Sequence, residues 1–344
     1  MSSNTAISIK QSQKRRLHEI LLGFKKGRVL VIGDFILDQF VWGEVQRISP
    51  EAPVPVVNVR RESYMPGGTL NVASNIRTLG GTVYPCGVLG RDLQGRVLLK
   101  AIRREGIDTR GIIYDRERPT TVKTRIIAHS QQVVRFDREK VQEISKDHCQ
   151  KLLRFIKQII SEVDVLIIED YGKGVVQPPL LRPTIKLARQ YRKPVLVDPK
   201  EKHFSYYAGV TALTPNRKEA YTAYENGRMS HTGQGSPSLQ EVGHALVKRL
   251  KSEALLITLG EEGMALFERK GTMTHIPTTA REVYDVSGAG DTVIATFGLA
   301  LAAGAQMKEA ALISNLAAGI VVGKLGTATV SFEELAQAVD LLSL

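Results

Sequence analysis

The sequence is poor in cysteine, in tryptophan and in long apolar runs. Its 344 residues include two cysteines and one tryptophan, and aromatic residues make up 6% of the chain. Cys86 and Cys149 match no metal-ligand spacing, which argues against a disulfide framework or a zinc site. No apolar run reaches the ~18 residues that span a bilayer, and the N-terminal "MSSNTAISIKQSQKRR" lacks the apolar stretch of a signal peptide. We therefore expect a soluble, cytoplasmic protein without a membrane partner.

Acidic residues are also outnumbered, and the formal net charge is +12. Such a charge suits nucleic acid, a membrane surface or a small anionic ligand. The basic residues are scattered in short groups such as Lys14 to Arg16, often near acids. A nucleic-acid binder would show a basic stripe or an aromatic platform and a steep salt dependence of binding. Since neither feature is present, we expect no nucleic-acid partner and favour a phosphorylated small molecule as substrate.

What the sequence does contain is a regular alternation of strand and helix patterns. Apolar, β-branched runs predict buried strands at 28–34, 164–170, 194–198 and 254–260. Amphipathic segments predict helices at 69–79, 143–161, 178–191 and 238–251. This order predicts an α/β fold with a mostly parallel sheet flanked by helices, whose ligands lie beyond the carboxyl ends of the strands. The polar residues at those ends are Asp34, Asp170, Asp198 and Gly260.

Two stretches interrupt the alternation. Residues 54–63 and 120–139 have strand-like polar alternation and no long helix pattern. They predict a small antiparallel sheet that stands off the main domain as a lid or a dimer surface, with lid segments at about 41–62 and 120–136. Exposed strand edges are satisfied by pairing across two subunits, which predicts a homodimer through the lid.

The N-terminal residues form a separate part of this scheme. Residues 1–27 are expected to be an extension that is polar at first and then helical, because "RRLHEILLGF" has apolar residues at helical spacing. Residues 28–344 are expected to form one main domain, into which the lid segments are inserted.

A small-residue turn closed by one acid lies near the end of the chain, at Ser287 to Asp291. Its backbone N–H groups converge and the following helix start adds positive partial charge, so Gly288, Ala289 and Gly290 predict an anion site. Asp291 would repel a permanent anion, but it suits a base that takes a proton from a hydroxyl attacking a bound phosphate. The alternative is an ordinary helix start, in which Asp291 complements the helix dipole.

Other phosphate motifs fit poorly. "GIVVGKL" at 319–325 has three residues where a P-loop needs four between its glycines, and it ends in leucine. "GDFILD", which follows the first strand, carries no dinucleotide fingerprint. Neither a P-loop enzyme nor a nicotinamide enzyme is favoured.

Polar residues near the first strand suit a polyol ligand. Asp34 and Asp38 are four residues apart, and Asn71 follows in "PGGTLNVASNIRTLGG". Carboxylates and an amide can accept and donate bonds to sugar hydroxyls, and Gly67 and Gly68 let the backbone approach closely. The alternative is a helix cap with its first turn.

Two motifs together resemble the signatures of the ribokinase-like (PfkB) carbohydrate kinase family. These are "PGGTLNVA" and "DVSGAGDT", and the resemblance covers nearly the whole chain from about Arg28. Within that family, "RISPEAPVPVV", "DYGKG", "VDPK" and "LTPNRKE" are similar to the D-glycero-β-D-manno-heptose 7-phosphate kinases. Those kinases form one half of the bifunctional heptose kinase/adenylyltransferases of bacterial ADP-heptose synthesis, which supplies the lipopolysaccharide core.

The resemblance implies a role for each matching residue. Asp291 falls on the family's catalytic base, and the N–H groups of 288–291 fall on its anion hole. Asn216 and Glu219 fall on the Asn-x-x-Glu motif that helps to hold Mg²⁺ and the ATP phosphates. The other nucleotide-site positions are Lys200, Thr258, Gly260 and Asn315. The sugar-contacting positions are Asp34, Asp38, Gly67, Gly68 and Asn71.

A sugar phosphorylated at its far end also needs cations. Arg135 in "VVRFD" and Lys173 in "DYGKG" are candidates, and we include Asp170 in this substrate site. The alternative is that Arg135 and Lys173 are surface cations paired with Asp137 or Asp170.

The chain departs from the family pattern in three places. Ser287 replaces the usual threonine, which keeps the hydroxyl, and Thr69 follows the double glycine where alanine is commoner. No "HxGH" nucleotidyltransferase motif occurs before the last residue, Leu344. We therefore expect adenylyl transfer to belong to a separate protein, or to a segment removed from this one.

The resemblance implies an ATP- and Mg²⁺-dependent kinase that phosphorylates the anomeric hydroxyl of a heptose 7-phosphate. A ribokinase- or fructokinase-type enzyme would keep the same chemistry with another substrate. A protein of another class, a binding module without turnover, would keep the fold alone. Asp291 with Asn216 and Glu219 argues against that last alternative.

Overall fold

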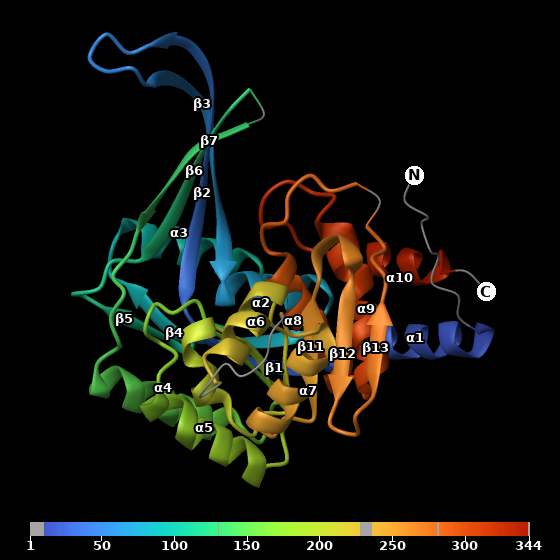
Figure 1. Ribbon diagram of the computed structural model, residues 1–344. Helices are drawn as coiled ribbons and strands as arrows, with labels where there is room; N and C mark the ends of the chain where they lie inside the picture. The colour runs from blue at the N-terminus through green and yellow to red at the C-terminus, as the bar shows by residue number, and fades with distance from the viewer. Residues whose placement is uncertain (1–9, 130, 228–235, 281, 343–344) are drawn as a thin grey trace.

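The computed structural model describes residues 10–129, 131–227, 236–280 and 282–342. Within these residues the centre is a nine-stranded sheet (Figure 1). The strands in sheet order are β13 (Met273–Ile276), β12 (Met264–Glu268), β11 (Ala254–Thr258), β10 (Ala212–Leu213), β9 (Val195–Asp198), β8 (Val165–Glu169), β1 (Arg28–Gly33), β4 (Thr82–Gly90) and β5 (Ile112–Asp115). All pairs from β11 to β5 are parallel, whereas β12 and β13 continue the sheet antiparallel at the opposite edge.

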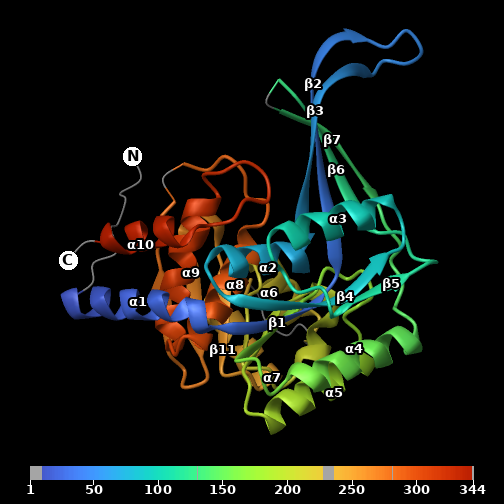
Figure 2. The ribbon, with the colours of Figure 1, turned by 180° about the vertical axis from the view of Figure 1, so that it is seen from behind.

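Helices cover both faces of this sheet (Figures 1 and 2). One face is packed against α1 (Gln11–Gly23), α2 (Thr69–Thr78), α3 (Leu93–Arg104), α8 (Ala289–Ala302), α9 (Met307–Val321) and α10 (Phe332–Asp340). The other face is packed against α4 (Lys146–Ile159), α5 (Pro178–Gln190), α6 (Arg217–Glu225) and α7 (Leu239–Leu250). Three short 3₁₀ helices are also present in the described part: η1 (Phe24–Lys26), η2 (Glu201–Tyr207) and η3 (Gly260–Glu262).

The central strand β1 shows why the strands are continuous apolar runs. Its side chains alternate between the two faces, so Val29 and Val31 enter one core while Leu30 and Ile32 enter the other. Because both faces are covered, neither set tolerates a polar residue. The predicted α/β fold with a mostly parallel sheet is confirmed.

The described residues also form a smaller sheet of four strands, which stands away from the main sheet (Figure 1). In sheet order its strands are β3 (Pro55–Gly68), β2 (Phe35–Ile48), β6 (Thr121–Ala128) and β7 (Gln131–Arg138). The predicted lid segments 41–62 and 120–136 fall on this sheet, which we call the lid. β2–β3 and β6–β7 are antiparallel as expected, but β2 and β6 are parallel, so the lid is a mixed sheet. The reason is that β2 follows β1 and β6 follows β5, and both leave the main sheet at the carboxyl ends of its parallel strands.

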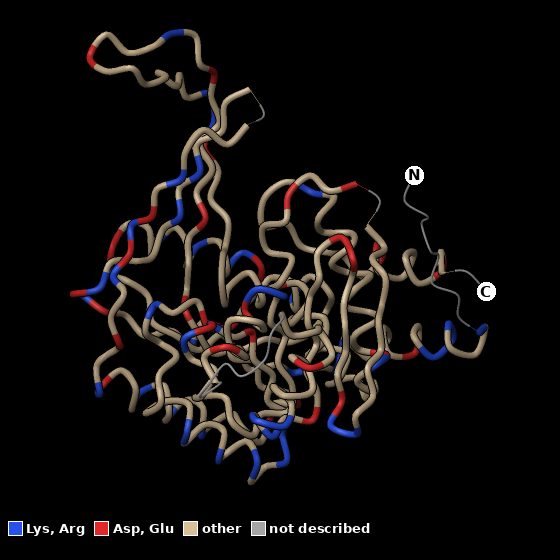
Figure 3. Tube along the Cα trace, in the orientation of Figure 1, with Lys and Arg blue, Asp and Glu red and all other residues tan. Residues whose placement is uncertain are grey.

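Charged residues are distributed over many elements. Lysines and arginines alternate with acids along the lid and around the helices (Figure 3). Among the described residues, no helix combines the length and the apolar character that crossing a membrane requires.

Candidate active site

The turn predicted to be an anion hole begins α8, and its backbone requires glycine. Gly288 has φ +79° at the N-cap of α8, a left-handed conformation that residues with a Cβ rarely adopt. A Cβ at Gly288 would also lie 2.6 Å from Nδ2 of Asn71, so glycine lets α2 approach the turn. Asp291 occupies the first turn of α8, where the helix dipole favours a negative charge.

Asp291 is buried and held in one orientation by two donors. Asn71 Nδ2 donates to Asp291 Oδ2 at 2.7 Å, and the Tyr171 hydroxyl donates to Asp291 Oδ1 at 2.8 Å. Burial raises the pKa of Asp291 to about 6, and the two hydrogen bonds oppose that rise. A carboxylate with this pKa is ionised at neutral pH and is still basic enough to accept a proton.

A pocket of about 510 Å³ leads to this turn. Five of the predicted nucleotide-site and anion-hole residues line it: Thr258, Gly260, Ala289, Gly290 and Asn315. Apolar residues from β12, α8, α9 and the segment before α8 complete the wall, among them Met264, Val283, Val293 and Ala318. An apolar pocket of this volume that ends at backbone N–H groups suits a nucleotide base followed by its phosphates.

The predicted Asn-x-x-Glu motif lies at the start of α6. The Asn216 side chain accepts from Glu219 N, and the Glu219 carboxylate accepts from Asn216 N, so the two form a capping box. Burial raises the pKa of Glu219. Lys200, the other predicted residue here, pairs with Glu201 at 3.0 Å and its charge also acts on Glu219.

Asp34 lies between β1 and β2 and is tied to the loop that follows β8. Its carboxylate accepts from the backbone N–H groups of Lys173 at 2.9 Å and Val175 at 3.0 Å. Burial raises the pKa of Asp34 to about 6. The carboxylate therefore fixes the loop in addition to any contact with a sugar.

The other predicted sugar residues lie where the lid strands meet α2. Asp38 of β2 is buried and forms an ion pair with Arg125 of β6. A Cβ on Gly67 would collide with the Asp38 carboxylate. Gly68 has φ +57°, and a Cβ there would lie 2.7 Å from the Asp34 carbonyl oxygen. The double glycine is thus required for the strand β3 to pass closely over Asp34 and Asp38 into α2.

The candidates for the far end of the sugar have protein partners. Arg135, on the exposed strand β7, pairs with Asp137 at 3.1 Å. Lys173 Nζ pairs with Glu139 at 2.7 Å, and not with Asp170. The Asp170 carboxylate accepts from the backbone N–H of Gly172 and the Tyr207 hydroxyl, and it contacts His203 Nδ1 at 2.7 Å.

Sequence reasoning missed two residues close to Asp291. Tyr171 donates to Asp291, and Lys123 of β6 lies with its Nζ 4.9 Å from the centre of the Tyr171 ring. Burial lowers the pKa of Lys123, and the charge of Lys123 lowers the pKa of Asp291. Tyr171 lies in the "DYGKG" segment between two predicted site residues, Asp170 and Lys173, and this position in the sequence could have identified it as a site residue.

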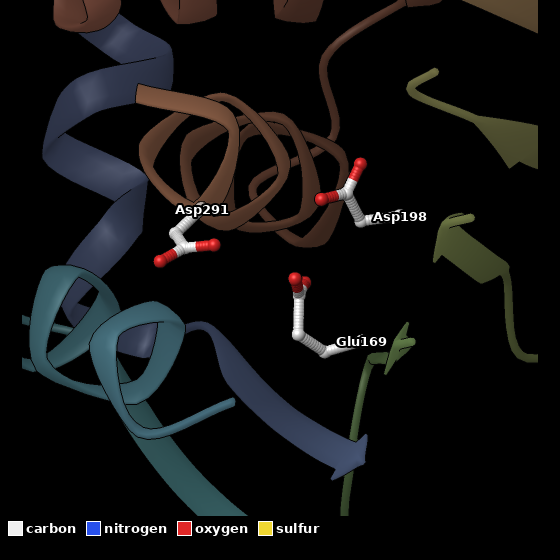
Figure 4. A group of neighbouring side chains, drawn as sticks. All are labelled: Glu169, Asp198 and Asp291. Carbon is white, nitrogen blue, oxygen red and sulfur yellow. The ribbon is translucent and has the colours of Figure 1, made fainter. Parts of the chain in front are cut away.

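Two further acids face Asp291 and complete an acidic cluster. Glu169 ends β8, Asp198 ends β9, and both point toward Asp291 (Figure 4). One oxygen of each carboxylate lies within 4.8 Å of one oxygen of both others. Burial raises the pKa of Glu169 and of Asp198, and neighbouring negative charges raise both further. Asp198 was predicted from its strand end, whereas Glu169 was missed.

The pocket, the glycine turn and the buried acid together define a phosphotransferase type of site. Residues 26–334 match the family described as pfkB family carbohydrate kinase. The chain belongs to this family, whose members transfer a phosphoryl group to a sugar hydroxyl.

Curated relatives and solved structures agree with this assignment. The chain is 46% identical over 324 residues to the bifunctional protein HldE of Geotalea uraniireducens, covering 94% of this chain and 65% of that protein. It is 44% identical over 311 residues to HldE of Helicobacter pylori, covering 90% of this chain and 65% of that protein. The chain thus spans about two thirds of the length of these relatives.

Two solved structures share the fold. Arabidopsis thaliana ribokinase complexed with ribose and ATP has a TM-score of 0.72 at 17% identity, with 92% of this chain and 99% of that chain covered. Phosphofructokinase-2 from Escherichia coli in complex with substrates and products has a TM-score of 0.75 at 18% identity, with the same coverage. The ribokinase-like fold with a separate lid sheet is therefore confirmed.

Proposed function

We propose that the chain phosphorylates the anomeric hydroxyl of D-glycero-β-D-manno-heptose 7-phosphate with ATP, giving the 1,7-bisphosphate in ADP-heptose synthesis. The observation that carries this proposal is Asp291, buried and oriented by Asn71 and Tyr171 next to the turn that ends the pocket. The identity of more than 40% to two HldE proteins supports the heptose branch of the family.

The chemistry assigned to each part is simple. ATP occupies the pocket, and the N–H groups of 288–291 stabilise the charge on the transferred phosphoryl group. Asp291 accepts the proton of the anomeric hydroxyl as its oxygen forms a bond to the γ-phosphorus, and ADP leaves with the electrons of the broken P–O bond. The lid excludes water, which would otherwise compete as the acceptor.

Magnesium is the expected second cofactor, and Glu219 with Asn216 is the predicted holder. One Glu219 oxygen is used in the capping box, so the other oxygen remains as a ligand or as a partner of a bound water. The charge of Glu219 is felt at Asp198, which places the motif beside the acidic cluster. A magnesium ion would neutralise charge on the ATP phosphates during transfer.

The lid strand β7 and the loop after β8 supply the two cations proposed for the 7-phosphate. Arg135 and Lys173 would exchange Asp137 and Glu139 for phosphate oxygens, which Arg and Lys bind strongly. Lys123 makes no ion pair with the described residues that would have to be given up first. We therefore add Lys123 to the predicted substrate site.

We also propose that two copies associate through their lids. Val134 and Phe136 of the edge strand β7 are 47% and 54% exposed. Large apolar side chains exposed on an unpaired strand edge favour association with another chain. Replacing both with lysine is expected to convert a dimer to a monomer in size-exclusion chromatography with light scattering. A wild-type monomer at assay concentration would contradict this arrangement.

A substrate panel tests the function. ADP release is measured with heptose 7-phosphate, unphosphorylated heptose, ribose and fructose 6-phosphate, and the position of the new phosphate is read by NMR. We expect turnover with heptose 7-phosphate and a new phosphate on C1. Faster turnover with an unphosphorylated sugar would favour a ribokinase- or fructokinase-type enzyme, and no turnover with any sugar would refute the proposal.

A further inference from the structure

Two buried asparagines lie one turn apart on α2. Asn71 and Asn75 are four residues apart, so their side chains lie on the same face of the helix. That face packs against α8, the helix that carries Asp291. A buried amide needs partners for its oxygen and for its nitrogen. The partners of Asn75 therefore bear on the orientation of Asn71.

Hydrogen bonds connect α8 through both asparagines to Asp291. The Thr292 hydroxyl donates to Asn75 Oδ1 at 3.2 Å and is shared with the Gly288 carbonyl oxygen at 3.0 Å. Asn75 Nδ2 donates to the Asn71 carbonyl oxygen at 3.0 Å and to Asn71 Oδ1 at 3.3 Å. Asn71 Nδ2 donates to Asp291 Oδ2 at 2.7 Å. Each asparagine thus accepts from one side and donates to the other.

The chemistry of the two ends fixes the direction of these bonds. The Asn71 carbonyl oxygen can only accept, so the nitrogen of Asn75 faces it, and the same nitrogen faces Asn71 Oδ1. An ionised Asp291 can also only accept, so Asn71 turns its nitrogen to it. If the Asn71 amide were reversed, its nitrogen would face the nitrogen of Asn75, and two donors would meet. Asn75 therefore permits one orientation of the Asn71 amide.

This restriction affects the protonated form of Asp291. A protonated carboxyl group has an O–H that needs an acceptor, and a reversed Asn71 amide would supply its oxygen. Because Asn75 prevents the reversal, the protonated acid lacks this acceptor while the ionised acid keeps its donor. The hydrogen bond from Asn71 lowers the pKa of Asp291. The ionised form is the one that can accept a proton from a hydroxyl.

We propose that Asn75 is a positioning residue for phosphoryl transfer, which fixes the Asn71 amide with its nitrogen toward Asp291 and so keeps Asp291 able to accept a proton. The inference deepens the proposed function, and its catalytic part rests on Asp291 being the base. The fixed orientation of the amide does not depend on the substrate. Asn75 acts only through Asn71, and it touches neither the sugar nor the nucleotide.

The ionisable groups that face Asp291 are separate from Asn75. They come from the lid, the loop after β8 and the ends of β8 and β9, and they are Asp38, Lys123, Tyr171, Glu169 and Asp198. In the described part of the chain, none of these side chains is hydrogen-bonded to Asn75. An uncharged residue in place of Asn75 therefore leaves the charges around Asp291 as they are.

The pKa of Asp291, measured in the full chain without nucleotide, sugar or metal, tests the inference. It is read by NMR with ¹³C-labelled aspartate carboxyl groups, and the signal of Asp291 is the one lost in Asp291→Asn. Asn75→Leu keeps the branched shape and removes the donor, so the Asn71 amide can reverse when Asp291 is protonated. One neutral hydrogen bond gained by the protonated form raises the pKa by about 0.4–1.1. We expect a rise in this range.

Two controls separate this effect from a general loosening of α2. Ser74 is also buried on α2, and its hydroxyl donates to Glu105 at 2.6 Å, away from the two asparagines. Ser74→Ala perturbs the helix without freeing the Asn71 amide, so the pKa of Asp291 should equal that of the wild type. In the Asn71→Leu background, Asn75→Leu should cause no further change, because the amide through which it acts is absent.

Three results would overturn the inference: an unchanged pKa of Asp291 in Asn75→Leu, an equal rise in Ser74→Ala, or the same further rise in the Asn71→Leu background. Circular dichroism shows whether each variant is folded, and Asn75→Ala repeats the test if Asn75→Leu is not. In an active enzyme the acidic limb of the kcat profile should move by the same amount, with the KM for ATP unchanged. A raised pKa with an unmoved limb would count against Asp291 as the base and leave the fixed amide in place. Since the pKa is measured without substrate, it stands whatever the sugar panel gives.

Discussion

Replacing Asp291 with asparagine should remove activity while making the folded chain more stable. Asparagine keeps the size of the side chain, and it can accept from Asn71 and donate to the Tyr171 oxygen, so the geometry of the site is preserved. It cannot accept the hydroxyl proton. Loss of a general base costs about 10²–10⁴ in rate, which is about 2.7–5.5 kcal/mol of barrier.

The stability change follows from the raised pKa of Asp291. Burial raises this pKa from 3.8 to about 6, so the folded chain binds the proton more tightly than the unfolded chain does. Stability should therefore fall as pH rises from about 4 to about 6, and the full cost of ionisation is present above that range. A shift of about two pKa units corresponds to about 3 kcal/mol, which sets the upper limit of the gain in Asp291→Asn at pH 8.

The two effects are measured separately. Coupled ADP release with saturating substrates and Mg²⁺ gives kcat, and urea unfolding at pH 8 in EDTA gives the stability of the metal-free protein. For the wild type, kcat should fall as pH drops through about 6, because Asp291 must be ionised to act. A variant that keeps more than about a tenth of the wild-type kcat would refute the assignment of Asp291 as the base.

Three other substitutions test the neighbours of Asp291. Tyr171→Phe removes a hydrogen bond that lowers the pKa of Asp291, so the acidic limb of the kcat profile should move to higher pH; an unchanged limb would count against a positioning role. Gly288→Ala should lower the free energy of unfolding in urea by about 1–2 kcal/mol, because residue 288 has a positive φ. It should also lower kcat by about 10²-fold, because the new Cβ displaces Asn71. Wild-type values of both quantities would show that the turn tolerates a side chain. Lys123→Met should raise the KM for heptose 7-phosphate about 10- to 100-fold, as loss of a charged hydrogen bond does, and leave the KM for ATP unchanged; an equal rise in both would argue against a phosphate contact.

Much of the fold could be predicted because buried parallel strands and amphipathic helices have distinct periods. The predicted helix at 178–191 is α5 (Pro178–Gln190), and the predicted strand at 194–198 is β9 (Val195–Asp198). The strands β12 and β13 were not predicted, since short edge strands with mixed residues carry a weak pattern. The parallel pairing of β2 and β6 depends on where two distant crossovers end, and local sequence contains no signal for it.

The site shows the same limit at the level of single side chains. Glu169 and Asp170 are adjacent acids at the end of one strand, and successive side chains of a strand point to opposite faces. Asp170 turns to His203 and Tyr207, whereas Glu169 turns to Asp198 and Asp291. Sequence alone locates a pair of acids at the strand end, but the choice between them depends on which face α8 covers.

The passage of β1 into β2 has a mechanical consequence. Asp34 lies at the end of the main sheet and Asp38 lies on the lid, and only three residues separate them. A sugar that contacts both carboxylates would connect the main sheet to the base of the lid. Each hydroxyl contact that is lost would then make the closed position of the lid less stable. The enzyme would then distinguish between sugars by the lifetime of the closed lid. Substitutions at the distant tip of the lid would change the rate of substrate release and leave the rate of phosphoryl transfer unchanged.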